Sequence, residues 1–532
     1  MSQSKKQNFL HGAALLAIAT AVVKIIGALY KIPLKMVIGD QGFGYFSTAY
    51  QIYSVLLMIS TAGFPIAMSR IISQASSLGN YNQVRKVYKT ARGIFLGIGL
   101  VSTLLMVVFC RQLAQFQEQP DAWAAVLCLG PCALLMGFLS TYRGFFQGQG
   151  NMLPTSISQM LEAVVKLVVG LVAAFIIMRY TNNVGLAAAG AILGVTVSCL
   201  VSAVFMRSKF VPAYRDLPRT DDEAETYTKV AKALLAIAVP ITIGSAGLQL
   251  LTLLETKLYM GQLLTANGFS QDKADTMKGI YDMAQTIFNM PCAFIIPITI
   301  SVIPAVTEQL TLGQNKAVRE TEESAARITG LLSLPCTVGL CILASPIMAL
   351  LGDYSGEKLT LSATLMALLG FCVFPYAIIQ YTNSLLQSHG YAHVPVINML
   401  ICGAVRLVVV YLLVGNPAIH IYGAPIGGIL CYCAIAVMNL LAIRHLVPQK
   451  PALLKNLLRS LLPAVIMGVV VWGCYWALQN LLHMTSRVIL CGVPIAVGAL
   501  VYFVAVVIFK SITREDCQLL PKGDKIAKLL RL

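Results

Sequence analysis

Charged side chains are scarce in this chain of 532 residues. Only 11% of the residues are Asp, Glu, Lys or Arg, whereas 57% are hydrophobic. A soluble enzyme needs a charged surface, so the composition excludes an ordinary protein of that class. Apolar stretches of about 20 residues recur along the chain, and each is long enough to cross a bilayer as a helix. They are continuously apolar rather than alternating, so the sequence predicts helices and not barrel strands.

Signatures of enzymes and metal sites are also missing. The glycine-rich stretch from Gly144 to Gly150 lacks the Lys-Ser/Thr ending of a phosphate-binding loop. His389 and His393 are four residues apart but have no HExxH context, and we expect them to be solvated loop residues. Nearly all of the 14 cysteines lie inside apolar segments, where they are expected to pack as small apolar residues. The sequence therefore predicts no enzymatic activity, no cofactor and no metal.

Acidic residues are fewer than basic ones, 22 against 39, which gives a formal charge of +17. The basic residues are scattered between apolar segments and form no extended basic domain, so nucleic acid is not the expected partner. No cleavable signal peptide is apparent, because the apolar run from Phe9 continues through charged residues. We expect that run to be the first spanning helix.

The apolar stretches predict fourteen spanning helices, and this even number puts both termini on one side of the membrane. By this topology 27 of the 39 basic residues lie on the side of the termini, eight on the other side and four within spans. The asymmetry predicts that both termini are cytoplasmic. The helices are expected at 10–34, 46–70, 91–111, 122–142, 157–179, 184–206, 230–256, 280–306, 327–351, 360–386, 394–415, 420–443, 457–480 and 487–510.

The chain also repeats itself, as transporters built from two related halves do. Val-Lys-Leu-Val-Val at 165–169 recurs as Val-Arg-Leu-Val-Val at 405–409, and Ala-Leu-Leu-Ala-Ile-Ala at 14–19 recurs at 233–238. These matches predict two pseudo-symmetric six-helix lobes and two further C-terminal helices. The expected divisions are an N-terminal lobe 1–210, a cytoplasmic linker 211–229, a second lobe 230–445, and helices 13 and 14 with a basic tail at 446–532.

Helix-breaking residues gather in the first two helices of the halves, which makes those helices candidates for bending. Neighbouring helices or water can satisfy the carbonyl groups that such breaks free. The alternative is that these residues are simply tolerated, as they often are in membrane helices. The candidate hinge residues are Pro33, Gly63, Pro65, Pro240 and Gly244.

A family resemblance rests on the stretch 143–162. The sequence Arg143-Gly144-Phe145-Phe146-Gln147-Gly148, followed by Met152, Pro154, Thr155, Ser158, Gln159 and Glu162, resembles the signature R-G-x-x-Q-G-x-x-x-M-x-P-T-x-x-S-Q-x-x-E. That signature is typical of the stage V sporulation protein B branch of the multidrug/oligosaccharidyl-lipid/polysaccharide exporter superfamily. This branch is related to the MurJ-type lipid II flippases, and the similarity extends over essentially the whole chain.

The resemblance implies a transporter whose two lobes enclose a central cavity, with a groove for a lipid tail on helices 13 and 14. It also implies that cationic residues of the first helix face the cavity. Lys24, followed by Ile25-Ile26-Gly27, resembles the Arg-x-x-Gly of MurJ proteins, and a second family arginine falls near Lys31.

The chemistry of the spanning lysines agrees with that implication. A lysine near the centre of a membrane helix costs about 2.5–3.5 kcal/mol on insertion scales, so Lys24 needs a partner or a wet cavity. Lys31 is two helical turns further along the same face, and Arg406 is the repeat-mate of Lys166. We therefore predict that Lys24, Lys31 and Arg406 bind substrate. Snorkelling to the outer interface is the alternative for Lys31, and also for Lys35, which we otherwise expect at the outer mouth.

Two further charge pairs stand out. Glu162 and Lys166 have the i, i+4 spacing of a helical ion pair, so they are either a structural pair or a substrate contact. Glu255 and Lys257, near the outer end of the seventh predicted helix, are an interfacial anchor or a coupling site. The first predicted helix has no acidic residue, which argues against the cation coupling of the multidrug branch.

Together these features predict a flippase that works by alternating access in a bacterial plasma membrane. It would carry a polyprenyl-pyrophosphate-linked cell-wall precursor from the inner to the outer leaflet. Its expected partners are that lipid-linked sugar, membrane lipids and cell-wall synthesis proteins. Two alternatives stay open: a multidrug or cation antiporter of the same superfamily, and a scaffold for wall assembly that transports nothing.

Overall fold

The computed structural model describes residues 3–61, 63–220, 223–513 and 516, and within these residues it is helical with no strand. The chain divides into two compact units, Met1–Asp282 and Met283–Leu532. The division falls inside one long helix, α9 (Gln271–Thr311), and not in the predicted linker 211–229. The four predicted divisions of the chain remain predictions.

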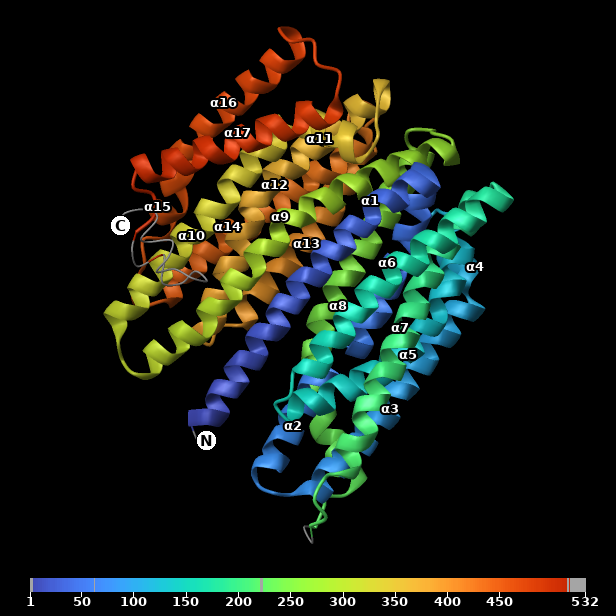
Figure 1. The fold of residues 1–532 in the computed structure, drawn as a ribbon, viewed down its shortest axis with the longest axis vertical. Helices are drawn as coiled ribbons and strands as arrows, with labels where there is room; N and C mark the ends of the chain where they lie inside the picture. Colours follow the sequence, from blue (N-terminus) through green and yellow to red (C-terminus); the bar gives the residue numbers. More distant parts are fainter. Residues whose placement is uncertain (1–2, 62, 221–222, 514–515, 517–532) are drawn as a thin grey trace. The chain divides into compact units, whose positions relative to one another are not determined.

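The first unit is built around three helices rich in small residues. In this unit α5, α6 and α7 lie side by side (Figure 1). Residues such as Gly170 and Gly194 let α6 and α7 approach closely, since a Cβ added to Gly194 would meet Gly170 at 2.4 Å. The helices of the unit are α1 (Gln3–Thr61), α2 (Phe64–Ser77), α3 (Tyr81–Val108), α4 (Cys110–Phe116), a 3₁₀ turn (Pro120–Ala122), α5 (Trp123–Gly148), α6 (Leu153–Thr181), α7 (Val184–Arg215), α8 (Tyr227–Thr265) and the start of α9.

The backbone of α1 is interrupted at Gly39 and not at the predicted hinge Pro33. Gly39 has φ 70° and ψ −174°, a conformation that only glycine adopts readily, and the helical residues on either side of it belong to two predicted spans. Pro33 and Pro240 lie inside helices α1 and α8, and Pro65 lies in the first turn of α2, where its missing N–H costs little. Gly244 is outside the residues that the structure describes fully.

The second unit comprises the rest of α9 and all later helices. Here α12 packs between α10 and α14, and α16 runs alongside α17 (Figure 1). The helices are α10 (Asn315–Ile342), α11 (Ala344–Leu351), α12 (Gly356–Ser388), α13 (His393–Val414), α14 (Gly423–Leu446), α15 (Leu453–Leu457), α16 (Leu461–Asn480) and α17 (Arg487–Ile508), with 3₁₀ turns at His420–Tyr422 and Leu458–Ser460.

Buried polar pairs hold the loops of the second unit. Arg327 of α10 donates to both oxygens of Asp516, the shortest contact being 2.7 Å, and also to Asn456 at 3.2 Å. The ring of His389 lies 2.6 Å from a carboxylate oxygen of Glu322. The expectation that His389 is a solvated loop residue is therefore wrong.

Membrane-spanning helices account for most of the chain. Twelve helical stretches in the described residues are long and apolar enough to cross a bilayer, so the chain is an all-α, multi-pass membrane protein, as predicted. The first stretch, Ile26–Ser77, contains the whole predicted span 46–70 and part of 10–34, and α9, which covers 280–306, is not among the twelve. The count of fourteen is thus not confirmed and stays a prediction.

Candidate functional site

Buried charges gather where α1 meets the start of α9 in the first unit. The sequence places Lys278 in an outer loop, but α9 already begins at Gln271 and the Lys278 side chain is completely buried. A completely buried lysine requires a partner, because isolated charges are very costly to remove from water. The buried ionisable residues of this region are Lys35, Asp40, Asp275, Lys278 and Asp282.

Two glycines bring α1 and α9 together. Gly39 permits the turn in α1 that precedes Asp40. Gly279 of α9 lies so close to this turn that a Cβ on it would stand 1.8 Å from the carbonyl oxygen of Asp40. Asp40 in turn forms an ion pair with Lys35, with Nζ and Oδ1 3.3 Å apart. Lys35 is therefore a buried partner of Asp40 and does not extend to the surface by snorkelling, while its place at the outer mouth stays a prediction.

Lys278 and Asp282 form the tightest ion pair of the region. They are one turn apart on α9, their charged atoms are 2.6 Å apart, and Lys278 also donates to the carbonyl oxygen of Gly44 at 3.3 Å. Both side chains are buried. The i, i+4 spacing of Lys278 and Asp282 was a sequence signal for this pair, but it lay partly outside the predicted span.

Asp275, one turn before Lys278, ties three segments together. Its carboxylate accepts hydrogen bonds from Tyr45 of α1 at 3.0 Å, from Gln119 before α5 at 2.8 Å and from Gln271 of α9 at 3.0 Å. Hydrogen bonds from neutral donors hold a carboxylate without cancelling its charge. These contacts fix the end of α9 against α1.

Lys31 belongs to the same charged region. Its side chain lies within electrostatic range of Lys278 and Asp282 on α9 and of Lys166 on α6. We call Lys31, Lys166, Lys278 and Asp282 the cationic group, since it joins three positive charges to one negative charge. The predicted site residue Lys31 is thus accompanied by two lysines from other helices, an arrangement suited to an anion.

Glu162 forms an ion pair with Arg143. The predicted ion pair was between Glu162 and Lys166, so that prediction is wrong. Arg143 Nη2 lies 3.0 Å from the Glu162 carboxylate, and Arg143 Nε donates to Ser158 at 3.0 Å. These three residues belong to the family signature, so part of the signature forms a clamp between α5 and α6. Other signature residues lie near the connection between α5 and α6. Gly144 and Gly148 of α5 pack against α2, and Pro154 is in the first turn of α6. Gln147 lies near the end of α5, and Gln159 lies in the second turn of α6.

Glu255 and Lys257 have different surroundings on α8. Glu255 is buried, with 7% of its surface exposed, whereas the ammonium group of Lys257 lies 3.9 Å from the centre of the Phe116 ring. Phe116 also lines an apolar cavity of about 510 Å³ in the first unit. The choice between an interfacial anchor and a coupling site for Glu255 and Lys257 stays a prediction.

Arg406 lies in the second unit, on α13. Its guanidinium is 5.6 Å from the centre of the Tyr432 ring and faces Gly428, both on α14. The prediction that Arg406 binds substrate together with Lys31 stays a prediction.

Lys24 is outside the residues whose side chains the structure describes. Across the described part of the chain, no three His, Cys, Asp or Glu residues are grouped to hold a metal ion.

Comparison with known families decides the classification. A family model described as "Polysaccharide biosynthesis protein" matches residues 9–309, more than half of the chain. The chain belongs to this family. A second model, MatE, matches residues 279–412. The predicted membership of the multidrug/oligosaccharidyl-lipid/polysaccharide exporter superfamily is confirmed.

Three curated relatives of this family member come from Bacillus subtilis (strain 168) and are aligned over nearly their full lengths. The uncharacterized membrane protein YabM is 26% identical over 99% of this chain and 97% of its own. The lipid II flippase MurJ is 24% identical over 93% of this chain and 94% of its own. Stage V sporulation protein B is 22% identical, covering 97% and 98%. The predicted branch, related to stage V sporulation protein B and to MurJ, is confirmed as well.

Solved structures support the same fold for this family member. A multidrug resistance transporter of the MATE family in its inward-facing conformation has a TM-score of 0.65, with 15% identity over 80% of this chain and 97% of its own. Lipid II flippase MurJ in an inward closed conformation has a TM-score of 0.62, with 15% identity over 93% and 98%. At this identity the likeness concerns the fold alone.

Proposed function

We propose that this family member is a flippase for a polyprenyl-pyrophosphate-linked cell-wall precursor in a bacterial plasma membrane. It carries the precursor from the inner to the outer leaflet by alternating access, with both termini in the cytoplasm. The observation that carries the proposal is the cationic group, because Lys31 of α1 lies within electrostatic range of Lys166 of α6 and of the buried ion pair Lys278–Asp282 of α9. The relationship to a lipid II flippase along nearly the whole chain supports the same class of substrate.

The charge of the group suits a pyrophosphate that must also be released. Lysines act on phosphate as movable point charges, whereas arginines hold it with two parallel hydrogen bonds. Lys31 and Lys166 are half-buried, whereas Lys278 is completely buried and pairs with Asp282. An inside-negative membrane potential favours outward movement of an anion by about 2.3 kcal/mol per charge per 100 mV. The membrane potential is therefore the driving force that we propose.

Reconstitution into liposomes with labelled polyprenyl-pyrophosphate glycans tests the proposal. We expect outward movement of the label in wild type and a decrease of about tenfold or more in Lys31→Ala, since a hydrogen bond to a charged group is worth about 1.5–3 kcal/mol. We expect a similar decrease in outward movement for Lys24→Ala, a variant chosen from the sequence alone.

Lys316→Ala is the matched control, because that lysine lies on α10 with 93% of its side chain exposed. It should transport as wild type does. Absence of outward movement in wild type would refute the flippase, and equal rates for Lys31→Ala and Lys316→Ala would refute the role of the cationic group.

A multidrug or cation antiporter is the second candidate, and buried carboxylates favour it. The first predicted helix has no acidic residue, but Asp40 lies on the continuation of α1, and Asp275 and Asp282 on α9 are buried with it. Buried carboxylates are the groups that coupling cations bind. An antiporter would move protons or sodium ions in the same liposomes when a drug is added, and a flippase driven by membrane potential would not.

A further inference from the structure

A cavity of about 450 Å³ lies at the loop between α14 and α15, within the second unit. Its walls are apolar side chains of α14, such as Leu440 and Leu441, and of the following segment, such as Leu453 and Leu454. Its charged lining residues are Arg444, Lys450 and Lys455. Among the described residues that line the cavity, all charged side chains are therefore basic.

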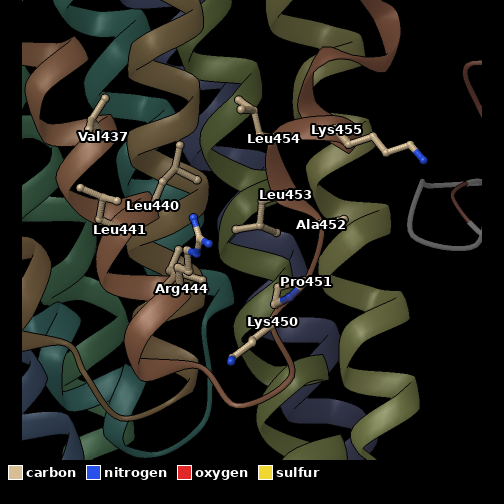
Figure 2. Close-up of a pocket in the computed structure, with 11 residues that line it drawn as sticks. Val437, Leu440, Leu441, Arg444, Lys450, Pro451, Ala452, Leu453, Leu454 and Lys455 are labelled. Atoms are coloured by element: carbon tan, nitrogen blue, oxygen red, sulfur yellow. The ribbon is translucent and has the colours of Figure 1, made fainter.

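The basic side chains have distinct orientations. In Figure 2 Arg444 projects from α14 into the space between the two walls, and Lys450 extends from the opposite segment toward α14. Lys455 points away from that space. Two cations therefore face one cavity, where together they can contact one anionic group.

The wall that carries Lys450 is held in place by hydrogen bonds to α10. The N–H of Ala452 donates to Glu323 at 3.1 Å, and Gln449 donates to Asn315 at 2.9 Å. Glu323 is itself paired with Arg319 at 2.9 Å, so its charge is compensated. Lys450 has φ 45°, a left-handed conformation that is uncommon outside glycine and persists only where its surroundings fix it. The cavity is accordingly a preformed site.

The position of the cavity indicates a lipid. It lies between the ends of two candidate spans, His420–Leu446 and Leu453–Asn480. Side chains of its lining are exposed although they are large and apolar: Val437 by 55%, Leu441 by 51% and Leu454 by 57%. Exposed apolar side chains beside a span face hydrocarbon, while cations at the end of a span meet headgroups.

We propose that this cavity binds an anionic glycerophospholipid of the leaflet on the side of the termini. Arg444 and Lys450 contact the headgroup phosphate, and the acyl chains lie along Val437, Leu441 and Leu454. The site shares no residue with the cationic group, and it does not depend on the substrate that the transporter carries. The cytoplasmic leaflet carries a negative surface potential from its anionic lipids, and the predicted topology puts this loop on that side.

Native mass spectrometry of the full chain in detergent tests the site. We expect the first bound phosphatidylglycerol to be retained more tightly than phosphatidylcholine by wild type. The double variant R444Q/K450Q should bind phosphatidylglycerol about thirtyfold more weakly, since two basic residues near a membrane surface together contribute about 2 kcal/mol. Leu454→Glu, which adds a negative charge to the rim without touching either cation, should weaken it too.

The matched control is R207Q/K209Q, which removes two exposed cations near the end of α7. It should retain phosphatidylglycerol as wild type does. Equal retention of the two phospholipids by wild type, or equal loss in the test and control variants, would overturn the proposal. So would complete displacement of phosphatidylglycerol by inorganic phosphate or by a polyprenyl diphosphate, because the site would then belong to a free anion or to the transported lipid.

Discussion

At the scale of single residues, the first unit depends on the balance of buried charges. Lys278 is completely buried, and its contacts with Asp282 and with the carbonyl oxygen of Gly44 satisfy it. Lys31 is close enough to feel the charges of both Lys278 and Asp282. Asp282 therefore stabilises more than one lysine, and the two members of the ion pair are not equivalent.

Asp282→Asn is expected to destabilise the protein more than Lys278→Met does. Breaking a buried ion pair by removing one partner costs about 3–5 kcal/mol. Loss of Asp282 leaves the positive charges of Lys278 and Lys31 without a carboxylate between them, whereas loss of Lys278 leaves Asp282 beside Lys31. Thermal unfolding of the detergent-solubilised protein, followed by tryptophan fluorescence, measures the difference, with Lys316→Ala as the exposed control. Equal midpoints for the two buried variants would contradict this account of the cationic group.

Arg143 and Glu162 provide a second test at this scale. Glu162→Gln should leave Arg143 with a neutral acceptor and lower the unfolding temperature, because hydrogen bonds to charged groups contribute about 1.5–3 kcal/mol. The exchange R143E/E162R should recover part of the loss. Lys166→Gln on the same helix should change stability little, since Glu162 pairs with Arg143. A larger decrease in unfolding temperature for Lys166→Gln than for Glu162→Gln would instead support the ion pair between Glu162 and Lys166.

At the scale of helices, glycines set how closely α1, α2, α8 and α9 approach. Gly63 precedes α2 and faces α8, where an added Cβ would lie 2.1 Å from the carbonyl oxygen of Ala238. Gly279 plays the same part between α9 and Asp40. Both contacts are with backbone atoms, which cannot move away as a flexible side chain can. The predicted hinge residue Gly63 is thus also a packing residue.

Gly63→Ala should force α2 away from α8. We expect a loss of about 1–3 kcal/mol of stability, as in other overpacked sites, together with slower transport. Gly97→Ala in α3 is the matched control, because nothing lies within 4 Å of its added Cβ and alanine favours helix. Thermal unfolding and the liposome assay measure both effects. A Gly63→Ala protein as stable as the Gly97→Ala protein would show that the helices can separate without cost.

At the scale of the whole molecule, a residue near the C-terminus holds the second unit. Asp516 accepts hydrogen bonds from Arg327 and Ser324 of α10 and from the backbone of Thr513. Arg327 also contacts Asn456, which lies in α15, ahead of α16. One buried carboxylate therefore connects the segment after α17 with α10 and with the entry to α16.

Asp516→Ala should leave the Arg327 guanidinium without its carboxylate and destabilise the second unit. We expect a loss of about 3–5 kcal/mol and faster proteolysis of the loop 447–452, since removal of one partner exposes a buried charge. Limited proteolysis with mass spectrometry locates the cleavage, and Asp353→Ala, which removes an exposed partner of Arg487, is the control. Unchanged proteolysis in Asp516→Ala would show that Arg327 finds other acceptors.

The sequence by itself determined the class of this protein. Continuous apolar runs cannot be exposed to water and lysines inside them need special surroundings, so length and composition were enough to predict helices in a membrane. The local signature from Arg143 to Glu162 was enough to predict the family branch. These features depend on neighbours in the chain, which the sequence displays directly.

Only the tertiary structure decided which charges meet. Lys35 with Asp40, Lys278 with Asp282 and Arg143 with Glu162 were each missed or assigned to other roles. The first two pairs are buried where α1 and α9 approach closely at Gly39 and Gly279, more than two hundred residues apart in the chain, and the third joins α5 to α6. The spacing of residues along one helix fixes which side chains share a face, but it does not say what the face meets.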